Sequence, residues 1–164
     1  MNAKGGSAAG VEPTKLLVVL HGVNLNLLGE RSPKHYGTLT LPELEESLRA
    51  EAARHGWACA CHQTNHEGDF VELIHRYRRR ATAMIVNPGA WTHYSYAIHD
   101  ALELVDGPLA EVHLSAVEQR ESWRRVSVVS DVADVRVWGK GETGYHQAFH
   151  LLIEAVERAQ GEKA

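Results

Sequence analysis

A glutamate and a histidine interrupt an otherwise apolar run in the second half of the chain. Glu111 and His113 lie two residues apart in the segment LAEVHL (109–114), and in a strand this spacing puts both side chains on one face. A buried carboxylate needs a partner, and Glu111 could hold the His113 imidazole in one tautomer and one orientation. The pair would then present His113 as an oriented acid for proton transfer.

The loop formed by residues 21–37 carries a second possible proton-transfer group. It has about 17 residues, which is long for a plain connector, and its glycines permit the hinge motion of an active-site lid. Tyr36 could act as a general base only if its pKa fell from about 10. An arginine about 4 Å away could lower that pKa by about 3 pH units, and Arg31 and Arg120 are the candidates. The chemistry would be proton abstraction next to a carbonyl, with His113 as the acid.

Further polar residues follow the segments that we expect to be strands. Asn24 follows the first of these segments, Asn87 follows the third, and Ser115 lies beyond the fourth. Ligands of parallel α/β folds bind beyond the carboxyl ends of the strands, so we expect these side chains at one rim. His93 and Asp100 are seven residues apart, which predicts that they share one face of the third helix.

Apolar segments that could form strands alternate with amphipathic segments that could form helices, with no hairpin signals between them. This alternation predicts a parallel sheet with helices on both faces. Five strands in about 145 residues match the flavodoxin-like, doubly wound α/β fold with strand order 2-1-3-4-5. Thr40 and Glu43 predict a capping box for the first helix, and Thr92 is expected to cap the third. The expected strands are 16–20, 57–64, 84–87, 109–114 and 133–139, and the expected helices are 41–55, 70–77, 92–102, 117–125 and 144–159.

Composition narrows the class of protein. A chain of 164 residues and 18.2 kDa predicts one domain, which we expect over 15–160. Glycine, serine and alanine dominate residues 1–14, which we expect to be a disordered leader. The chain's 17 basic and 21 acidic residues give a net charge of −4, which argues against nucleic acid as the main partner.

No apolar run approaches about 18 residues, so we expect no membrane span. Cys59 and Cys61 would share one face of a strand, where a disulfide is geometrically poor, and this predicts a reducing compartment, the cytoplasm.

Two patterns that often bind cofactors or metals occur here in contexts that argue against that role. The run GKGETG (139–144) matches the dinucleotide-binding glycine pattern, but no later strand follows to carry the acidic residue. The pairs His62/His66 and His146/His150 have the spacing of helical metal ligands. The first pair falls on a strand and a turn, however, and the second is expected on a helix surface. We therefore expect neither a cofactor nor a metal.

Five segments of the chain resemble type II 3-dehydroquinate dehydratase, over about residues 16–156. They are LHGVNLNLLGERSPKHYG (20–37), QTNHEGDFVELI (63–74), IVNPGAWTHYSYAIHDAL (85–102), EVHLSAVEQRESWR (111–124) and GKGETGYHQA (139–148). The resemblance implies the flavodoxin-like fold and a hydro-lyase that converts 3-dehydroquinate into 3-dehydroshikimate, in the shikimate pathway of aromatic amino acid biosynthesis or in quinate catabolism. It also implies that no metal or Schiff base takes part, and that trimers assemble into a homododecamer.

The resemblance implies how the elimination is catalysed. Tyr36 would be the base that takes the C2 proton, with Arg31 activating it and Arg120 assisting. His113 would protonate the departing hydroxyl, and Glu111 would orient it. The resulting enolate can be stabilised by fixed hydrogen bonds rather than by a cation.

The resemblance also implies which groups bind the ligand. Asn24 would hold a water that stabilises the enolate, and Asp100 would reach into the site of a neighbouring subunit. The groups implied to hold the hydroxyls and carboxylate of the substrate are Asn87, His93, Arg124 and the backbone of Leu114 and Ser115.

Several positions depart from the residues that are usual in the family. They are His21 and Val23 in place of Asn and Pro, Tyr94 in place of Thr, His99 in place of Arg, Ala116 in place of Asn, Glu118 in place of His, and Val128 in place of Tyr. The residues that the resemblance implies for catalysis are all present in this chain, whereas these neighbouring positions differ from the family. Two alternatives therefore stay open: a diverged relative that acts on another cyclic polyhydroxy keto acid, and a non-catalytic ligand-binding or assembly protein on the same fold.

Overall fold

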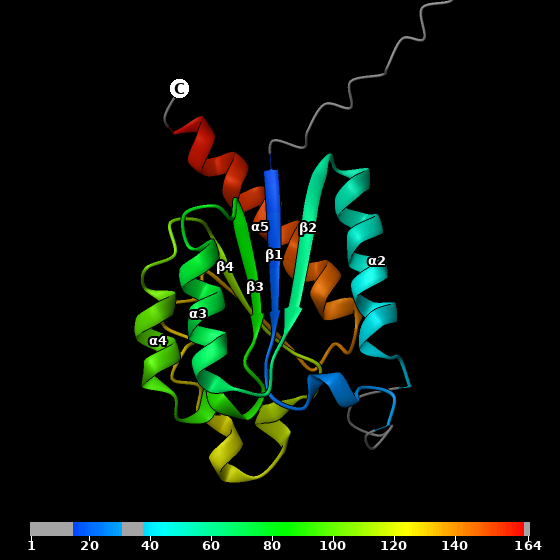
Figure 1. The fold of residues 1–164 in the computed structure, drawn as a ribbon, viewed down its shortest axis with the longest axis vertical. Helices are drawn as coiled ribbons and strands as arrows, with labels where there is room; N and C mark the ends of the chain where they lie inside the picture. Colours follow the sequence, from blue (N-terminus) through cyan, green and yellow to red (C-terminus); the bar gives the residue numbers. More distant parts are fainter. Residues whose placement is uncertain (1–14, 31–37, 163–164) are drawn as a thin grey trace, which may run out of the picture.

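The computed structural model describes residues 15–30 and 38–162, which form a five-stranded, all-parallel sheet (Figure 1). The strand order is β2-β1-β3-β4-β5, so the predicted order 2-1-3-4-5 is confirmed. The leader expected at 1–14 lies outside the described residues, as do Arg31 and Tyr36. The strands are β1 (Lys15–His21), β2 (Trp57–Gln63), β3 (Ala83–Asn87), β4 (Leu109–His113) and β5 (Val135–Trp138).

Helices cover both faces of the sheet, as the alternating pattern predicted (Figure 1). Along β1, Leu17 and Val19 join one hydrophobic cluster with α2 and α5, whereas Val18 and Leu20 join another with α3 and α4. This is the side-chain alternation of a strand that is buried on both faces. No described helix combines the length and the apolar composition that crossing a membrane requires. The helices are α2 (Leu41–Arg54), α3 (Glu67–Tyr77), α4 (Tyr96–Leu102) and α5 (Thr143–Gly161), with 3-10 helices η1 (Leu25–Leu27), η2 (Gly89–His93), η3 (Val117–Gln119) and η4 (Ser122–Arg125).

The starts of two helices show where local sequence signals succeed and fail. Helix α2 begins with the predicted capping box, in which the Thr40 backbone N–H donates to Glu43 Oε2 at 2.8 Å. The predicted cap of the third helix is wrong, because α4 begins after Ser95, whose hydroxyl accepts from the Ile98 backbone N–H at 3.1 Å. Thr92 lies instead in η2, where its hydroxyl donates to a buried carboxylate of β4.

The same shift overturns the prediction that His93 and Asp100 share one helix face. His93 is the last residue of η2, whereas Asp100 lies within α4, and the chain leaves helical geometry between them. The 3-10 turn buries Trp91 and Thr92, and these buried side chains imitate the apolar spacing of a longer helix. The short helix or helical turn expected at 117–125 consists of two separate 3-10 helices, η3 and η4.

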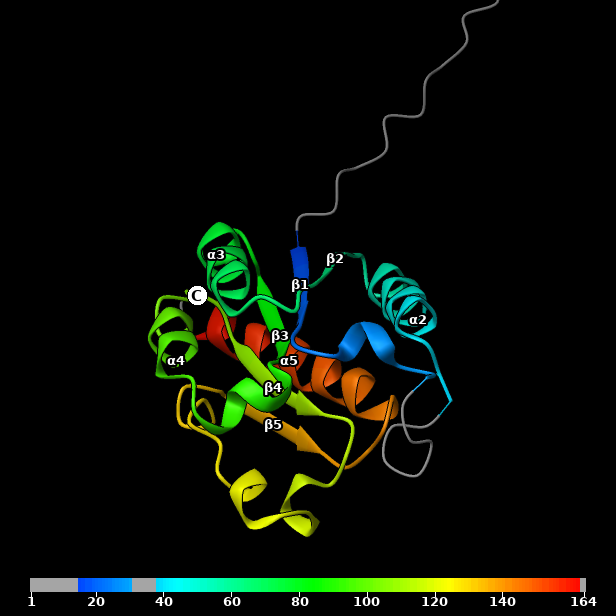
Figure 2. The same cartoon turned by 60° about the horizontal axis from the view of Figure 1, so that its bottom comes forward.

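The carboxyl ends of β1 and β3 approach each other closely, and this brings together the turns that follow them (Figure 2). The Gly22 backbone N–H donates to the Asn87 carbonyl at 2.8 Å. A Cβ atom added to Gly22 would lie 2.4 Å from the Pro88 carbonyl oxygen, which is far inside van der Waals contact. Only glycine therefore lets the two backbones meet at this distance, and the turns that carry Asn24 and Asn87 depend on that contact.

Replacing Gly22 tests this requirement. We expect Gly22→Ala to lower the free energy of unfolding by about 1–3 kcal/mol, the usual cost of forcing an extra group into a packed interior. The matched control is Gly68→Ala in α3, where an added Cβ would meet nothing within 4 Å. Equilibrium urea unfolding of both variants measures the difference, and equal stabilities would contradict the proposed role of the close approach.

Candidate active site

A pocket of about 100 Å³ opens beyond the carboxyl ends of β1, β3 and β4. Its walls come from the strand ends and from the 3-10 helices beyond them, which Figure 2 brings to the front. This is the edge at which parallel α/β folds bind ligands. Eight residues singled out from the sequence line the pocket: Asn24, Asn87, His93, His113, Leu114, Ser115, Arg120 and Arg124.

The hydrogen bond expected between Glu111 and His113 is present. His113 Nε2 lies 2.8 Å from Glu111 Oε1, and both side chains are almost completely buried. Because an ionised carboxylate can only accept, the imidazole proton of this bond belongs to Nε2. The ring also meets Trp138 edge-on, with the ring centroids 5.7 Å apart. His113 is therefore held in one tautomer and one orientation at the wall of the pocket.

The Glu111 carboxylate receives further hydrogen bonds from three hydroxyl groups. Thr92 Oγ1 donates to it, Ser127 Oγ lies 2.9 and 3.0 Å from its two oxygens, and Ser130 Oγ donates at 2.8 Å. Burial would raise the pKa of Glu111, but the hydrogen bonds and charge of His113 and the hydroxyl donors hold the pKa below its ordinary value. Glu111 thus stays ionised although it is buried.

These hydroxyl residues were not identified as site residues from the sequence. Thr92 carries the signal of a helix cap, and Ser127 and Ser130 lie in a segment without a predicted element. The available signal was indirect: a carboxylate in the middle of an apolar strand requires donors from elsewhere in the chain. Nothing in the local sequence says which residues supply them.

Asn87 is buried at the pocket with its amide held from two sides. Its Nδ2 donates to the Tyr145 hydroxyl at 2.9 Å, and its Oδ1 accepts from the Gly89 backbone N–H at 3.2 Å. The Tyr145 oxygen also lies 3.2 Å from His21 Nδ1. Burial raises the pKa of the Tyr145 phenol beyond its usual range, against the bond from Asn87. Tyr145 therefore remains a neutral hydroxyl that fixes the orientation of Asn87.

Asn24 enters the pocket from a strained turn. It is the one described non-glycine residue with a positive φ, 65°, a conformation that asparagine tolerates better than most residues. Its backbone N–H donates to Asn65 Oδ1 at 2.8 Å, and Asn65 Nδ2 donates to Asn26 Oδ1 at 3.1 Å. Asn65 is a supporting residue that the sequence did not reveal, because it lies 41 positions away.

Two guanidinium groups and a further imidazole also line the pocket. Arg124 Nε lies 3.0 Å from Glu121 Oε2, and its guanidinium stacks 4.0 Å from the Trp123 ring centroid. Arg120 lies 3.5 Å from the Ser115 hydroxyl.

His93 Nδ1 lies 2.7 Å from the Val126 carbonyl oxygen, and therefore donates to it. Burial lowers the pKa of His93, although the bond to Val126 opposes this. Two cations beside neutral donors suit an anionic ligand that carries hydroxyls.

Asp100, in contrast, lies outside the pocket of its own chain. Its side chain is 79% exposed and its carboxylate lies 3.3 Å from His99 Nδ1. Tyr36 and Arg31, the remaining predicted residues, lie outside the described part of the chain, as do all of residues 31–37 in the loop predicted to act as a lid.

A larger hollow of about 980 Å³ adjoins the pocket, and residues 139–142 of the GKGETG run line it. The glycines of this run support the turn after β4. The Gly139 backbone N–H donates to the His113 carbonyl at 3.0 Å, and that of Gly141 donates to the Leu114 carbonyl at 3.1 Å. Gly139 has a φ of +72°, and a Cβ there would lie 2.9 Å from Ala116 Cβ. The motif thus holds residues 113–116 against the pocket.

The histidine pairs considered as metal ligands make separate contacts. His62 Nε2 lies 2.8 Å from the Tyr77 hydroxyl, and His146 Nε2 lies 2.9 Å from Ser47 Oγ. Among the described residues, three other groups bring potential ligand atoms together, and none of them lines the 100 Å³ pocket. They are His21/Glu45/Cys61, Glu51/His55/His150 and His99/Asp100/Glu103.

Comparisons with known proteins point to one family. The family model described as dehydroquinase class II matches residues 15–153. A 3-dehydroquinate dehydratase of Pelobacter propionicus is 44% identical over 147 residues, which cover 89% of this chain and 99% of that protein. A catabolic 3-dehydroquinase of Penicillium rubens is 44% identical over 151 residues, which cover 92% of this chain and 97% of that protein. The crystal structure of a type II dehydroquinase from Butyrivibrio crossotus is similar with a TM-score of 0.82 at 36% identity, covering 84% of this chain and 97% of that one.

The hydrogen bonds around Glu111 predict a pH-dependent contribution to stability. At about pH 7 we expect Glu111→Gln to lower the free energy of unfolding by about 1–3 kcal/mol, because an amide cannot accept from all the donors. The folded pKa lies below the ordinary 4.5. The contribution is therefore complete above 4.5 and is lost as the pH falls through the folded pKa.

Urea unfolding from about pH 7 to about pH 3.5 measures the difference between wild type and Glu111→Gln. The exposed Glu118→Gln is the matched control and should show no comparable loss. A difference between wild type and Glu111→Gln that stays constant over this range would count against the ionised, hydrogen-bonded carboxylate.

Proposed function

Since the chain belongs to the class II dehydroquinase family of hydro-lyases, as its motifs indicated, we propose that it removes water from 3-dehydroquinate to give 3-dehydroshikimate. The observation that carries this proposal is the buried Glu111–His113 pair at a pocket that also contains Arg120 and Arg124. An imidazole that is oriented through its Nε2–H can protonate a departing hydroxyl when its Nδ1 also carries a proton. Guanidinium groups bind carboxylates such as that of the substrate.

In the proposed reaction, Tyr36 takes the C2 proton and His113 protonates the departing hydroxyl. Arg31 activates Tyr36 and Arg120 assists. The roles of Tyr36 and Arg31 rest on their place in the motif (20–37). The role of Arg120 is supported by its position at both the pocket and the adjoining hollow, because a nearby cation lowers the pKa of a phenol.

The enolate that forms between the two proton transfers needs fixed donors around it. Asn24 lines the pocket with a backbone held by Asn65, and we assign it the water that stabilises the enolate. No metal ion, cofactor or Schiff base enters the proposed steps. Binding of the substrate's hydroxyls and carboxylate is assigned to Asn87, His93, Arg124 and the backbone of Leu114 and Ser115, all of which line the pocket.

We further propose that residues 15–160 act as one catalytic domain in the cytoplasm, on a small-molecule substrate and without nucleic acid. The cytoplasmic assignment is supported by two free cysteines, Cys59 and Cys61, whose Sγ atoms lie 3.6 Å apart without a bond. Cysteines without a disulfide are typical of proteins of reducing compartments.

The direct test mixes purified protein with 3-dehydroquinate and follows the absorbance of the conjugated enone product. Turnover supports the proposal. Turnover only with another cyclic polyhydroxy keto acid would favour the diverged relative, and ligand binding without any turnover would favour the non-catalytic alternative.

Tyr36→Phe tests the proposed base, because it keeps the ring and removes the ionisable oxygen. We expect kcat to fall by about 10²–10⁴-fold, the usual contribution of a general base, while ligand binding persists. The matched control is Tyr96→Phe, which removes a hydroxyl from a side chain that is 68% exposed. A Tyr36→Phe enzyme within about threefold of wild type would remove Tyr36 from the mechanism.

The second residue-level test concerns assembly. Asp100 is exposed on its own chain, and we propose that it completes a neighbouring subunit's site within a dodecamer built from trimers. The native protein should then elute at about 200 kDa, near twelve times its 18.2 kDa. Asp100→Ala should reduce both kcat/KM and the assembly size, whereas the neighbouring exposed Glu103→Ala should reduce neither. A wild-type protein that is monomeric and fully active would overturn the shared site.

A further inference from the structure

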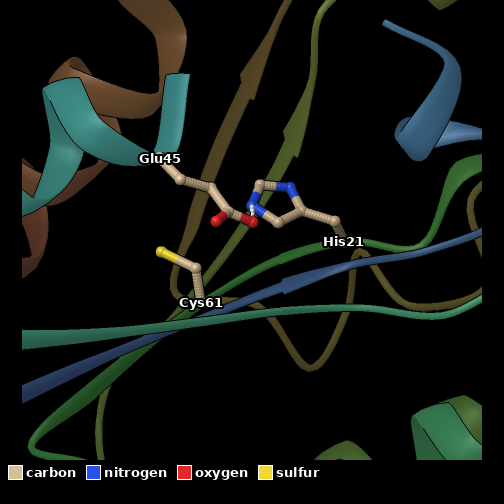
Figure 3. A group of neighbouring side chains, drawn as sticks. All are labelled: His21, Glu45 and Cys61. Carbon is tan, nitrogen blue, oxygen red and sulfur yellow. Dashed lines mark ion pairs between the residues drawn. The ribbon is translucent and has the colours of Figure 1, made fainter. Parts of the chain in front are cut away.

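Three potential metal ligands from three different elements converge on the α2 face of the sheet (Figure 3). His21 ends β1, Glu45 lies on α2 and Cys61 lies on β2. The ligand atoms of the three side chains all lie within 4.8 Å of one another. None of the three residues lines the candidate active-site pocket, so this group is a separate feature of the fold.

The most informative atom of the group is His21 Nε2. The His21 side chain is completely buried, and its Nε2 has no hydrogen-bond partner among residues 15–30 and 38–162. The Glu45 Oε1 atom toward which it points lies 3.7 Å away, which is too long for a hydrogen bond. Buried polar atoms without a partner are rare in folded proteins. An imidazole nitrogen aimed at a carboxylate and a thiol calls for a ligand between them.

The outer atoms of the group are already held in place. His21 Nδ1 lies 3.2 Å from the Tyr145 hydroxyl, and Arg49 donates to Glu45 Oε2 at 2.8 Å. Metal-binding histidines and carboxylates commonly have their second polar atom fixed in this way. The atoms left over, His21 Nε2 and Glu45 Oε1, face the same space as Cys61 Sγ (Figure 3).

We propose that His21 Nε2, Glu45 Oε1 and Cys61 Sγ bind one Zn²⁺ ion. Imidazole, carboxylate and thiolate are the ligands that zinc takes, with a tetrahedral arrangement. Zinc–nitrogen and zinc–oxygen bonds of about 2.1 Å imply a separation of about 3.4 Å between those two ligands. The observed 3.7 Å needs to close by only a few tenths of an ångström.

The charges and protons of this site balance. The site requires the tautomer in which His21 Nδ1–H donates to the Tyr145 hydroxyl, because this tautomer leaves the lone pair on Nε2. The Cys61 thiol releases its proton to solvent when the metal binds. The thiolate and the Glu45 carboxylate then neutralise the two positive charges of the ion. Solvent reaches the cluster beside Glu45, which is 16% exposed, and a water supplies the fourth ligand.

Cys59 offers a matched control. Its Sγ lies 3.6 Å from that of Cys61, yet Cys59 is not part of the group whose ligand atoms all lie within 4.8 Å. The proposal therefore requires Cys61 and not Cys59. A metal bound by the cysteine pair alone would require both.

The experiment adds Co²⁺ to the reduced, metal-stripped full chain and then displaces it with Zn²⁺. We expect one Co²⁺ per chain, the intense visible bands of tetrahedral cobalt and a thiolate-to-cobalt charge-transfer band, all of which Zn²⁺ abolishes. Cobalt binding without the thiolate band would place the ion elsewhere, for example at the thiol-free group Glu51, His55 and His150, and would overturn the proposal. So would the absence of binding.

Variants then identify the ligands by competition with a chromophoric chelator. Loss of an outer-shell contact costs about 10–100-fold in metal affinity, so we expect Cys61→Ser and His21→Asn to weaken Zn²⁺ binding by more than about 100-fold. Cys59→Ser should stay within about threefold of wild type.

Urea unfolding of the metal-stripped variants establishes that each is folded, and Cys61→Ser alone decides the matter if His21→Asn does not fold. Zinc affinity that falls equally in both cysteine variants, or that is unchanged in Cys61→Ser, contradicts the site. Because no readout uses turnover, failure here leaves the proposed dehydration untouched.

Discussion

The buried negative charge of Glu111 organises the functional edge of this molecule. An unpaired carboxylate in the interior is prohibitively costly, so donors must converge on it from η2, from the segment after η4 and from β4 itself. The Val128 backbone N–H also donates to the Thr92 carbonyl at 2.8 Å, which ties two of these segments together. Their convergence brings His93 on η2 and Arg124 on η4 to the same pocket as His113.

A second constraint acts on the other side of the pocket. The close approach of Gly22 to Pro88 joins the ends of β1 and β3, and Tyr145 on α5 fixes the amide of Asn87 by a hydrogen bond. The positions of Asn24 and Asn87 are therefore set by backbone packing, whereas the position of His113 is set by its hydrogen bond to a buried charge. The pocket that these residues line also contains Arg120 and Arg124.

The contacts of Tyr145 also connect the pocket with the proposed metal group. Its hydroxyl contacts both Asn87 and His21, and His21 in turn faces Glu45 and Cys61. His21 is thus a buried junction between the support of Asn87 and the proposed set of ligand atoms.

The amino-acid sequence by itself determined the features that depend on short-range spacing. The alternation of apolar and amphipathic segments predicted the strand order, Thr40 and Glu43 predicted the start of α2, and the two-residue spacing of Glu111 and His113 predicted their hydrogen bond. Each of these follows from the geometry of one strand, one helix turn or one crossover.

Only the tertiary structure decided which distant residues complete these local features. Thr92 lies 19 positions from Glu111, Asn65 lies 41 positions from Asn24, and Tyr145 lies 124 positions from His21. Local periodicity predicts that a side chain is buried, but it does not specify the side chain's partner. That choice depends on how separate elements pack against one another, because a buried polar atom must bond to whatever donor or acceptor the packing brings within reach.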